Sequence, residues 1–317
     1  LAQGIDHAYS YGTFNFSTED FYIKFLRGTL PYQLSVAPLM PQFYYWQAEN
    51  RSVKEQVLDL SPTQKQALFD FLQTNYLPQN REYQYKFFFD NCSTRLKDAL
   101  KAACGDSLQL TGYTAEKRSF RQWIDRYAFE QKPWADFGMD LAIGAPSDQE
   151  ATPEQATFLP DNLSAALDEA TLLSADASSK PLVRATQELY EATPPSAPFW
   201  LTPMLFFWVL AVAVAGFTYW QLHFKIVHVG FDRVLFTLLG LLGLLIVLLW
   251  FGTDHGVTAW NYDILWASPL WLPASWLLSR SAKPAWFQYW LIAYTVLLLA
   301  ATTNLAKHNL VLIPILV

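Results

Sequence analysis

Cys92 is the residue whose type and position best suit it to chemistry. It follows Asp90 and Asn91, which are natural helix N-caps, and an apolar repeat over residues 96–103 predicts that a helix begins there. A thiol in the first turn lies at the positive end of the helix dipole, and Arg95 follows one turn later. Both features favour the nucleophilic thiolate. The sequence therefore predicts Cys92 as a catalytic nucleophile with Asn91 and Arg95 as contributors; the alternative is a small buried cysteine at a helix start.

A cysteine nucleophile needs a general base, and the chain offers five histidines. They are His7, His223, His228, His255 and His308. His223 and His228 fall in a loop that we predict to be cytoplasmic, and His308 ends an apolar segment. His7 and His255 therefore remain as candidates for the base. No two histidines have helical metal-ligand spacing, and no CxxC, GxSxG, P-loop or dinucleotide motif occurs. The sequence thus predicts no metal site and no cofactor.

The second cysteine, Cys104, lies at the other end of the same predicted helix. Twelve helical residues span ~18 Å, whereas a disulfide requires Cα atoms within about 7 Å of each other. We therefore expect two independent thiols. The C-terminal end of a helix disfavours a thiolate, so Cys104 is expected to be structural.

The elements that must position Cys92 belong to an α+β domain predicted over residues 1–173. Strands are expected at 8–16, 30–36 and 53–60, and helices at 18–27, 63–76 and 120–129. Ser61 can cap the second of these helices, and Pro62 suits its first turn. Residues 174–198 are rich in Ser, Ala, Pro and Thr, which indicates a linker.

The back half of the chain, residues 199–317, is apolar. It holds five basic and three acidic residues, against 17 and 25 in residues 1–198. Apolar stretches occur at Phe199–Gln221, Val234–Phe251, Ile264–Leu278 and Trp286–Ala306, and a shorter one at 310–317. Since about 20 apolar residues cross a bilayer, we predict an all-α transmembrane domain of about five helices, with the third broken or tilted at Pro269 and Pro273. This pattern excludes a single soluble domain and a nucleic-acid binder, which would need a basic surface.

Charged residues in the loops predict the orientation. Basic pairs lie in two loops, at Lys225 and Arg233 and at Arg280 and Lys283. The positive-inside rule places these loops in the cytoplasm, so residues 1–198 and the loop 252–263, which lacks Lys and Arg, lie outside. That loop carries His255, Asn261 and Asp263 at the membrane surface. These residues are either solvated by lipid headgroups or line a site at the bilayer face.

The two ends of the chain predict that residues are missing. It begins at Leu1 without a signal peptide, and it ends in an apolar run too short to span a bilayer. We therefore expect a fragment cut at both ends, so that a catalytic partner of Cys92 can lie outside it.

Five runs of the sequence together form a recognisable pattern. They are GIDHAYSYGTFNFSTEDFYIKFLRGTLPYQLS (4–35), ENRSVKEQ (49–56), YKFFFDNCSTRLKDAL (85–100), FGMDLAIGAPSDQEAT (137–152) and TDHGVTAWNYDILWASPL (253–270). In these runs the chain resembles the Lnb family of bacterial lipoprotein N-acyltransferases. The resemblance covers most of the chain, and FFFDNCSTR is its most specific part.

The resemblance implies a periplasmic domain related to permuted papain-like, NlpC/P60-type hydrolases and acyltransferases, followed by a multi-pass domain of about five helices in the bacterial inner membrane. Cys92 matches the family's nucleophile. The family's catalytic histidine lies in an FGHT-like segment upstream of the first run, so it is expected before Leu1. His7 is then not that histidine, and the fragment alone is expected to be inactive.

The implied reaction is a two-step acyl transfer. Cys92 would accept an acyl chain from a phospholipid as a thioester and pass it to the α-amine of the diacylglyceryl-cysteine of a lipoprotein. Thr94, Arg95 or helix-start N–H groups would stabilise the oxyanion. Two other classes stay open. One is a membrane-anchored papain-like cysteine hydrolase, an amidase or peptidase acting on cell-envelope substrates. The other is a non-enzymatic domain that binds lipoprotein or glycan, with Cys92 buried.

Overall fold

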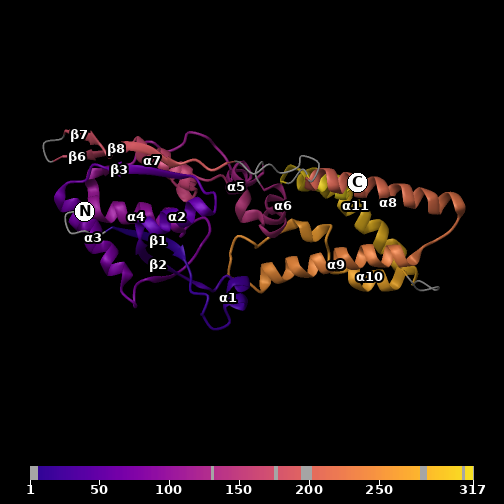
Figure 1. The fold of residues 1–317 in the computed structure, drawn as a ribbon. Coiled ribbons are helices and arrows are strands. Elements are labelled where there is room, and N and C mark those ends of the chain that lie inside the picture. The colour runs from indigo at the N-terminus through magenta and orange to yellow at the C-terminus, as the bar shows by residue number, and fades with distance from the viewer. Residues whose placement is uncertain are drawn as a thin grey trace. The chain divides into compact units, whose positions relative to one another are not determined.

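The computed structural model describes residues 6–129, 132–174, 178–193, 202–278, 284–308 and 311–316. The chain divides into two compact units (Figure 1). The N-terminal unit comprises Leu1–Trp123 and Glu150–Pro195, and the C-terminal unit comprises Ile124–Gln149 and Ser196–Val317. This division differs from the predicted boundaries at 173 and 198, because residues 124–149 belong with the apolar C-terminal segment.

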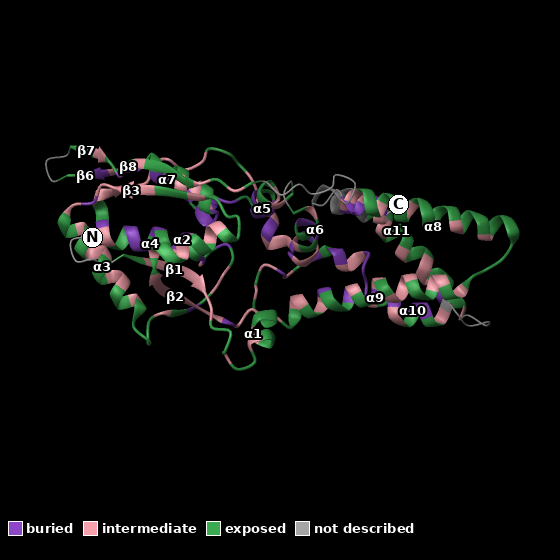
Figure 2. Ribbon diagram, in the orientation of Figure 1, coloured by how far each residue is buried: buried purple, intermediate pink, exposed green. Residues whose placement is uncertain are grey.

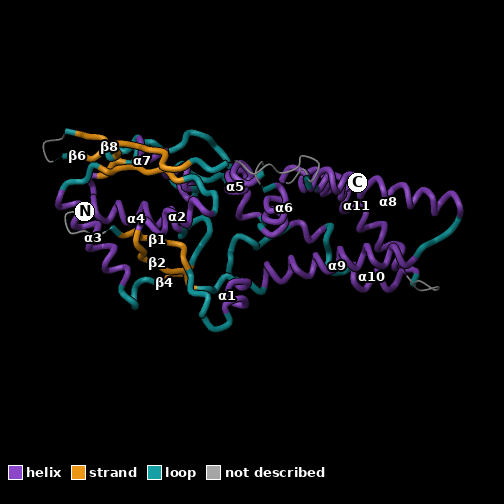
Figure 3. Tube along the Cα trace, viewed as in Figure 1, coloured by secondary structure: helices purple, strands orange, loops and turns teal. Residues whose placement is uncertain are grey.

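The N-terminal unit combines small antiparallel sheets with helices, as the α+β prediction requires. The first sheet has the order β1-β2-β4, formed by His7–Thr13, Pro31–Pro38 and Glu82–Gln84. A second pairs β3 (Val53–Leu58) with β8 (Val183–Tyr190), and a third joins β5 (Leu108–Gln109), β6 (Thr171–Leu173) and β7 (Ser179–Pro181). The strands are orange in Figure 3. The helices are α1 (Phe21–Arg27), α2 (Leu39–Ala48), α3 (Pro62–Tyr76), α4 (Cys92–Cys104) and α7 (Pro160–Asp168).

Local capping explains where α3 begins. The Ser61 hydroxyl accepts a hydrogen bond from the Gln64 N–H at 3.2 Å, and the Gln64 side chain accepts one from the Ser61 N–H at 3.0 Å. Pro62 occupies the first turn, where a missing N–H costs nothing. The predicted start of this helix is confirmed.

The predicted linker is wrong where the structure describes it. Residues 179–190 form β7 and β8, and β8 pairs with β3 through Val57 opposite Ala185 and Glu55 opposite Gln187. The Ser- and Ala-rich residues before β7 misled the prediction, because sheet pairing with a distant strand overrides local composition. Residues 175–177 and 194–198 of this segment lie outside the described residues.

The core of the N-terminal unit packs the last turns of α4 against α7. It consists of Leu60, Leu100, Cys104, Leu163, Leu167, Ala170, Leu172 and Leu182. A second, aromatic group holds the segment just before α4: the Phe88 ring stacks on Phe120 at 4.5 Å between centroids and meets Phe158 edge-on at 5.3 Å. Buried side chains therefore support both ends of the helix that begins at Cys92.

The C-terminal unit is helical. It contains α6 (Pro133–Ala142), α8 (Pro203–Phe224), α9 (Val229–Phe251), α10 (Trp271–Leu278), α11 (Ala285–His308) and α12 (Leu312–Leu316). Among the described residues, α8 and α9 are long and apolar enough to cross a membrane, and Ala285–Ala300 is a shorter apolar helix. Most residues of α8 are exposed, and few residues of either helix are buried (Figure 2), as in lipid-contacting helices. The third predicted stretch is broken, as expected: a short 3-10 helix at Tyr262–Leu265 precedes Pro269 and α10.

Helix α6 joins this unit because aromatic contacts and backbone hydrogen bonds hold it there. The Phe137 and Phe207 rings lie 5.1 Å apart, and Trp134 and Phe206 lie 5.5 Å apart. Just after α6, the Gly144 N–H donates to the Val257 carbonyl at 2.7 Å. The sequence did not predict α6, whose ten residues are too few for a clear period beside Pro133.

Two glycines let α9 pack closely against the chain that follows it. A Cβ at Gly240 would lie 2.7 Å from the Leu272 side chain, and a Cβ at Gly243 would overlap the Ala267 carbonyl oxygen. Ala267 and Trp266 are buried at this contact together with Ile246. The close approach of backbones therefore depends on the absence of side chains at these two positions.

Replacing Gly243 with alanine should destabilise the C-terminal unit by ~1–3 kcal/mol, the usual cost of overpacking. The expected result is a lower Tm of the protein in detergent, measured by thermal unfolding. Gly216→Ala in α8 is the matched control, because open space surrounds that position. Equal Tm values for the two variants would contradict this packing.

Candidate active site

Cys92 is the first residue of α4, and a complete capping box fixes that start. The Asn91 Oδ1 accepts hydrogen bonds from the Ser93 N–H at 2.9 Å and the Thr94 N–H at 3.0 Å. In return, the Thr94 hydroxyl oxygen accepts one from the Asn91 N–H at 2.8 Å. The predicted N-cap is confirmed as Asn91, and Cys92 lies in the first turn with an exposed side chain.

The Asn91 amide also ties this turn to the rest of the unit. Its Nδ2 donates to the Phe87 carbonyl at 2.9 Å and to the Phe158 carbonyl at 2.8 Å. The residue is 3% exposed. With both ends of its side chain engaged, Asn91 is a positioning residue for Cys92.

Arg95 is paired with Asp90. Its Nε lies 2.5 Å from one Asp90 carboxylate oxygen, and its Nη2 lies 2.7 Å from the other. The guanidinium carbon also lies 4.1 Å from the centroid of the Tyr83 ring. Because Asp90 neutralises this charge and Tyr83 covers it, Arg95 stiffens the turn before Cys92.

One strand passes directly beside the thiol. A Cβ at Gly12 of β1 would lie 3.3 Å from the Cys92 Cβ and 3.9 Å from its Sγ. Gly12 has φ +86, a left-handed conformation that other residues adopt at a cost, and it lies where the β1–β2 register shifts. Sequence reasoning missed Gly12; its place in YGTF within a strand is a signal for close backbone approach.

Two tyrosines, Tyr83 in β4 and Tyr85 just after it, have phenol groups whose pKa responds to Cys92. Burial first, and the neighbouring Cys92 second, raise the pKa of Tyr83 and of Tyr85. Both phenols therefore stay neutral at physiological pH. Tyr85 stacks on Tyr32 with 4.4 Å between centroids, and burial raises the pKa of Tyr32 as well. The sequence analysis did not single out this group of uncharged aromatic rings.

The structure gives the two candidate histidines different places. His7 opens β1 and is exposed, five strand residues from Gly12. That separation is ~16 Å, which is too far for a hydrogen bond to Cys92. His255 lies in the loop 252–263 of the C-terminal unit and is half-buried.

The other two candidates in that loop are structural. The Asn261 Oδ1 accepts from the Asp263 N–H at 2.9 Å, and its Nδ2 donates to the Leu141 carbonyl at 2.7 Å. Asp263 accepts a hydrogen bond from the Trp266 indole at 2.9 Å. At 2% and 8% exposure, both are buried: Asn261 fastens the loop to α6, and Asp263 fastens it to Trp266.

The sequence analysis found no metal-ligand pattern, yet three carboxylates converge in the C-terminal unit. Oxygens of Asp125, Asp136 and Asp140 lie within 4.8 Å of one another. Carboxylates so spaced can hold a hard cation. Each of them also interacts with other groups of the protein, so their convergence alone assigns no ion.

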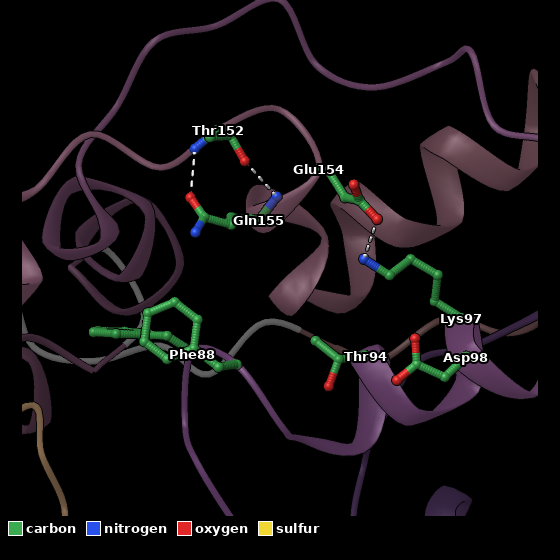
Figure 4. Close-up of a pocket in the computed structure, with 8 residues that line it drawn as sticks. Phe88, Thr94, Lys97, Asp98, Thr152, Glu154 and Gln155 are labelled. Atoms are coloured by element: carbon green, nitrogen blue, oxygen red, sulfur yellow. Dashed lines mark hydrogen bonds and ion pairs between the residues drawn. The ribbon is translucent and has the colours of Figure 1, made fainter.

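A polar pocket of about 330 Å³ lies on the other side of α4 (Figure 4). It is lined by Phe88, Phe89, Thr94, Lys97, Asp98, Thr152, Glu154 and Gln155. The Lys97 ammonium donates to Glu154 at 3.2 Å, and Lys101 donates to the same carboxylate at 2.7 Å. The hydrogen bond from Lys101 holds the pKa of Glu154 below its usual range. Since 100° separates successive helical residues, Thr94 and Lys97 face away from Cys92, and these ion pairs brace the helix.

Comparisons with known proteins match most of the chain. A family model described as the Lnb N-terminal periplasmic domain matches residues 3–126, and one described as the Lnb transmembrane domain matches residues 195–317. No curated protein and no solved structure matches. The first match contains Cys92 and the second contains the loop 252–263, whereas α6 and α7 lie in neither.

The two cysteines should differ sharply in reactivity. Cys92 is exposed, whereas burial both hides Cys104 and raises the pKa of its thiol, so that less thiolate forms at pH 8. Brief treatment with N-ethylmaleimide at pH 8, followed by peptide mass spectrometry, should label Cys92 and leave Cys104 unmodified until the protein is denatured. A native Cys92 that resists the reagent would support the non-enzymatic alternative.

Proposed function

The chain belongs to the Lnb family, and from this we propose that it is a lipoprotein N-acyltransferase with Cys92 as its nucleophile. Membership of the family indicates a membrane-associated enzyme that modifies lipoproteins. The observation that carries the finer assignment is an exposed thiol in the first turn of a fully capped helix. The non-enzymatic alternative requires a cysteine buried among apolar side chains, whereas Cys92 is exposed.

The first step of the proposed reaction acylates the enzyme. The Cys92 thiolate attacks the carbonyl carbon of a phospholipid acyl ester, a C–S bond forms, and the C–O bond to glycerol breaks. The leaving alkoxide takes a proton and departs as a lysophospholipid. Covalent catalysis of this kind divides one difficult transfer into two easier ones.

The second step passes the chain to the lipoprotein. The neutral α-amine of the diacylglyceryl-cysteine attacks the thioester carbonyl, an N–C bond forms, and the C–S bond breaks. The amine loses one proton, and Cys92 returns to its starting state. Water in place of the amine would give the hydrolase that remains the alternative.

The capping box narrows the choice of oxyanion donors. The Ser93 and Thr94 N–H groups are engaged by Asn91, the Thr94 hydroxyl takes part in the same box, and Arg95 binds Asp90. We therefore assign the oxyanion contact to the Cys92 N–H, which points out of the first helical turn. Asn91 and Arg95 contribute by holding that turn in place.

The apolar C-terminal unit would hold the enzyme at the membrane, where the proposed reaction takes place. Both proposed substrates are anchored in lipid, so an enzyme that acts on them gains from being anchored beside them. We propose a multi-pass, five-helix arrangement in the bacterial inner membrane with the N-terminal unit on the periplasmic side, and a papain-like origin for that unit. The apolar helices α8 and α9, with the basic residues Lys225 and Arg233 where they connect, support this arrangement.

Cys92→Ala should abolish N-acylation, because no other thiol can form the intermediate. The complete product of the gene that encodes this chain would be expressed in bacteria lacking their own lipoprotein N-acyltransferase. Mass spectrometry of a reporter lipoprotein's N-terminal peptide then measures the added acyl chain. Cys104→Ala is the matched control and should retain activity. Acylation that survives Cys92→Ala would refute the nucleophile assignment, and released lysophospholipid with no acylated peptide would indicate hydrolysis.

Gly12→Ala should slow acyl transfer in the same assay. The new methyl group would crowd the Cys92 side chain, and the left-handed backbone would add about 1 kcal/mol of strain. Gly105→Ala separates the two effects, because Gly105 has φ +55 and nothing within 4 Å of its Cβ position. Equal loss of activity in both variants would mean that backbone strain, and not contact with the thiol, is responsible.

A further inference from the structure

Helix α1 and the residue Phe16 before it present large apolar side chains that are mostly exposed. None of its residues is buried. Tyr22 is 78% exposed, Leu26 65% and Ile23 58%, and Phe16, just before the helix, is 74% exposed. Figure 2 shows α1 almost entirely in the colour of exposed residues. A group of large apolar side chains this exposed marks an interaction surface.

An unbroken row of aromatic rings connects this surface to the tyrosines around Cys92. Tyr85 stacks on Tyr32, whose ring lies 5.5 Å from Phe14. Phe14 in turn lies 5.5 Å from Phe21 in α1 and 4.9 Å from Phe16. Cys92 lies beside Gly12 of β1, the strand that pairs with β2, and β2 carries Tyr32 of the row. Neighbouring rings of the row lie 4.4–5.5 Å apart between centroids, within the range of aromatic pairs, so the row is uninterrupted.

We propose that the exposed face of α1, formed by Phe16, Tyr22, Ile23, Phe25 and Leu26, inserts into the outer leaflet of the phospholipid bilayer, and that the aromatic row leads an acyl chain from that leaflet to Cys92. Delivery of an acyl chain to Cys92 rests on the proposed function. Insertion of α1 into the bilayer is a property of the surface and holds with or without catalysis.

The side chains on α1 favour a lipid leaflet over other occupants. Lys24 and Arg27 lie in its last turn, where their apolar stems can lie along the leaflet while their charges reach lipid phosphates. Tyrosine and phenylalanine are side chains of the membrane interface. Glu19 and Asp20 precede the helix, so the acidic groups lie at its opposite end.

The chain itself brings the leaflet within reach. Only twelve residues, 191–202, separate β8 of the N-terminal unit from the apolar helix α8. The N-terminal unit is therefore tethered to the bilayer that α8 and α9 are long enough to cross. An apolar face on a tethered domain meets lipid at high local concentration.

Depth-dependent fluorescence quenching tests the insertion. The complete gene product would carry Cys92→Ala and Ile23→Cys, labelled with an NBD fluorophore, in phosphatidylethanolamine–phosphatidylglycerol vesicles. Gln66→Cys in α3 is the matched control, because Gln66 is exposed and distant in sequence from the α1 face. Spin-labelled lipids should quench the Ile23 probe at least about twofold more than the Gln66 probe.

Two outcomes would overturn the proposal. One is equal lipid quenching at the two positions. The other is an Ile23 probe that is shielded from aqueous iodide but not quenched by lipid, which would mean that a second copy of the chain or another protein surface covers α1. Since Cys92 is absent from these variants, neither outcome depends on the proposed reaction.

The delivery of the acyl chain is tested separately in the catalytically intact protein. Ile23→Asp should lower acylation from vesicle phospholipid by about tenfold. The same variant should leave acylation from a monomeric short-chain phospholipid unchanged. The matched control, Gln66→Asp, should leave acylation from both donors unchanged. Equal loss with both donors would refute the delivery role. A wild-type protein inactive with either donor would refute the proposed function and leave the fluorescence result standing.

Discussion

The start of α4 depends on one buried side chain. Asn91 accepts two hydrogen bonds from the first turn of the helix and donates two to backbone carbonyls outside it. Those carbonyls belong to Phe87 and Phe158, which are far apart in sequence and are brought together by the Phe88, Phe120 and Phe158 rings. An aromatic core thus orients a polar cap, and the cap orients Cys92. A buried amide must satisfy the hydrogen-bonding capacity of both its oxygen and its nitrogen. The four hydrogen bonds of Asn91 therefore restrict where the first turn of α4 can lie.

The sequence predicted this turn well, because the determinants are local. An N-cap residue, a polar residue three positions later and an apolar helical repeat are visible in NCSTRLKDAL, and they report hydrogen bonds made within a few residues. The apolar helices α8 and α9 were predicted for the same reason, because length and apolarity are local properties, whereas the predicted count of about five membrane helices is not confirmed. Even the break in the third stretch followed from its prolines.

What the sequence did not predict depends on contacts between distant segments. Gly12 matters because β1 passes Cys92, 80 residues later in the chain. Arg95 is a local exception: its charge was expected to act on the thiol, but its Nε and Nη2 bind the Asp90 carboxylate five residues earlier. Asn261 and Asp263 were candidates for a site at the membrane face, yet Leu141 of α6 and Trp266 occupy them. β8 and α6 were missed because each is defined by the partner on which it packs.

The surroundings of Cys92 also bear on which acceptor a thioester would meet. Water in contact with an acyl-enzyme hydrolyses its thioester. A transferase must therefore limit the access of water so that the acceptor amine reacts with the thioester first. Burial raises the pKa of Tyr83, Tyr85 and Tyr32, so these rings stay uncharged, and an uncharged aromatic surface holds an alkyl chain better than it holds water. Gly12 of β1 comes close to the Cys92 side chain, but the thiol itself is exposed. In the proposed transfer, contact of the acyl chain with these uncharged rings, and not burial of the thiol, would therefore have to favour the amine over water.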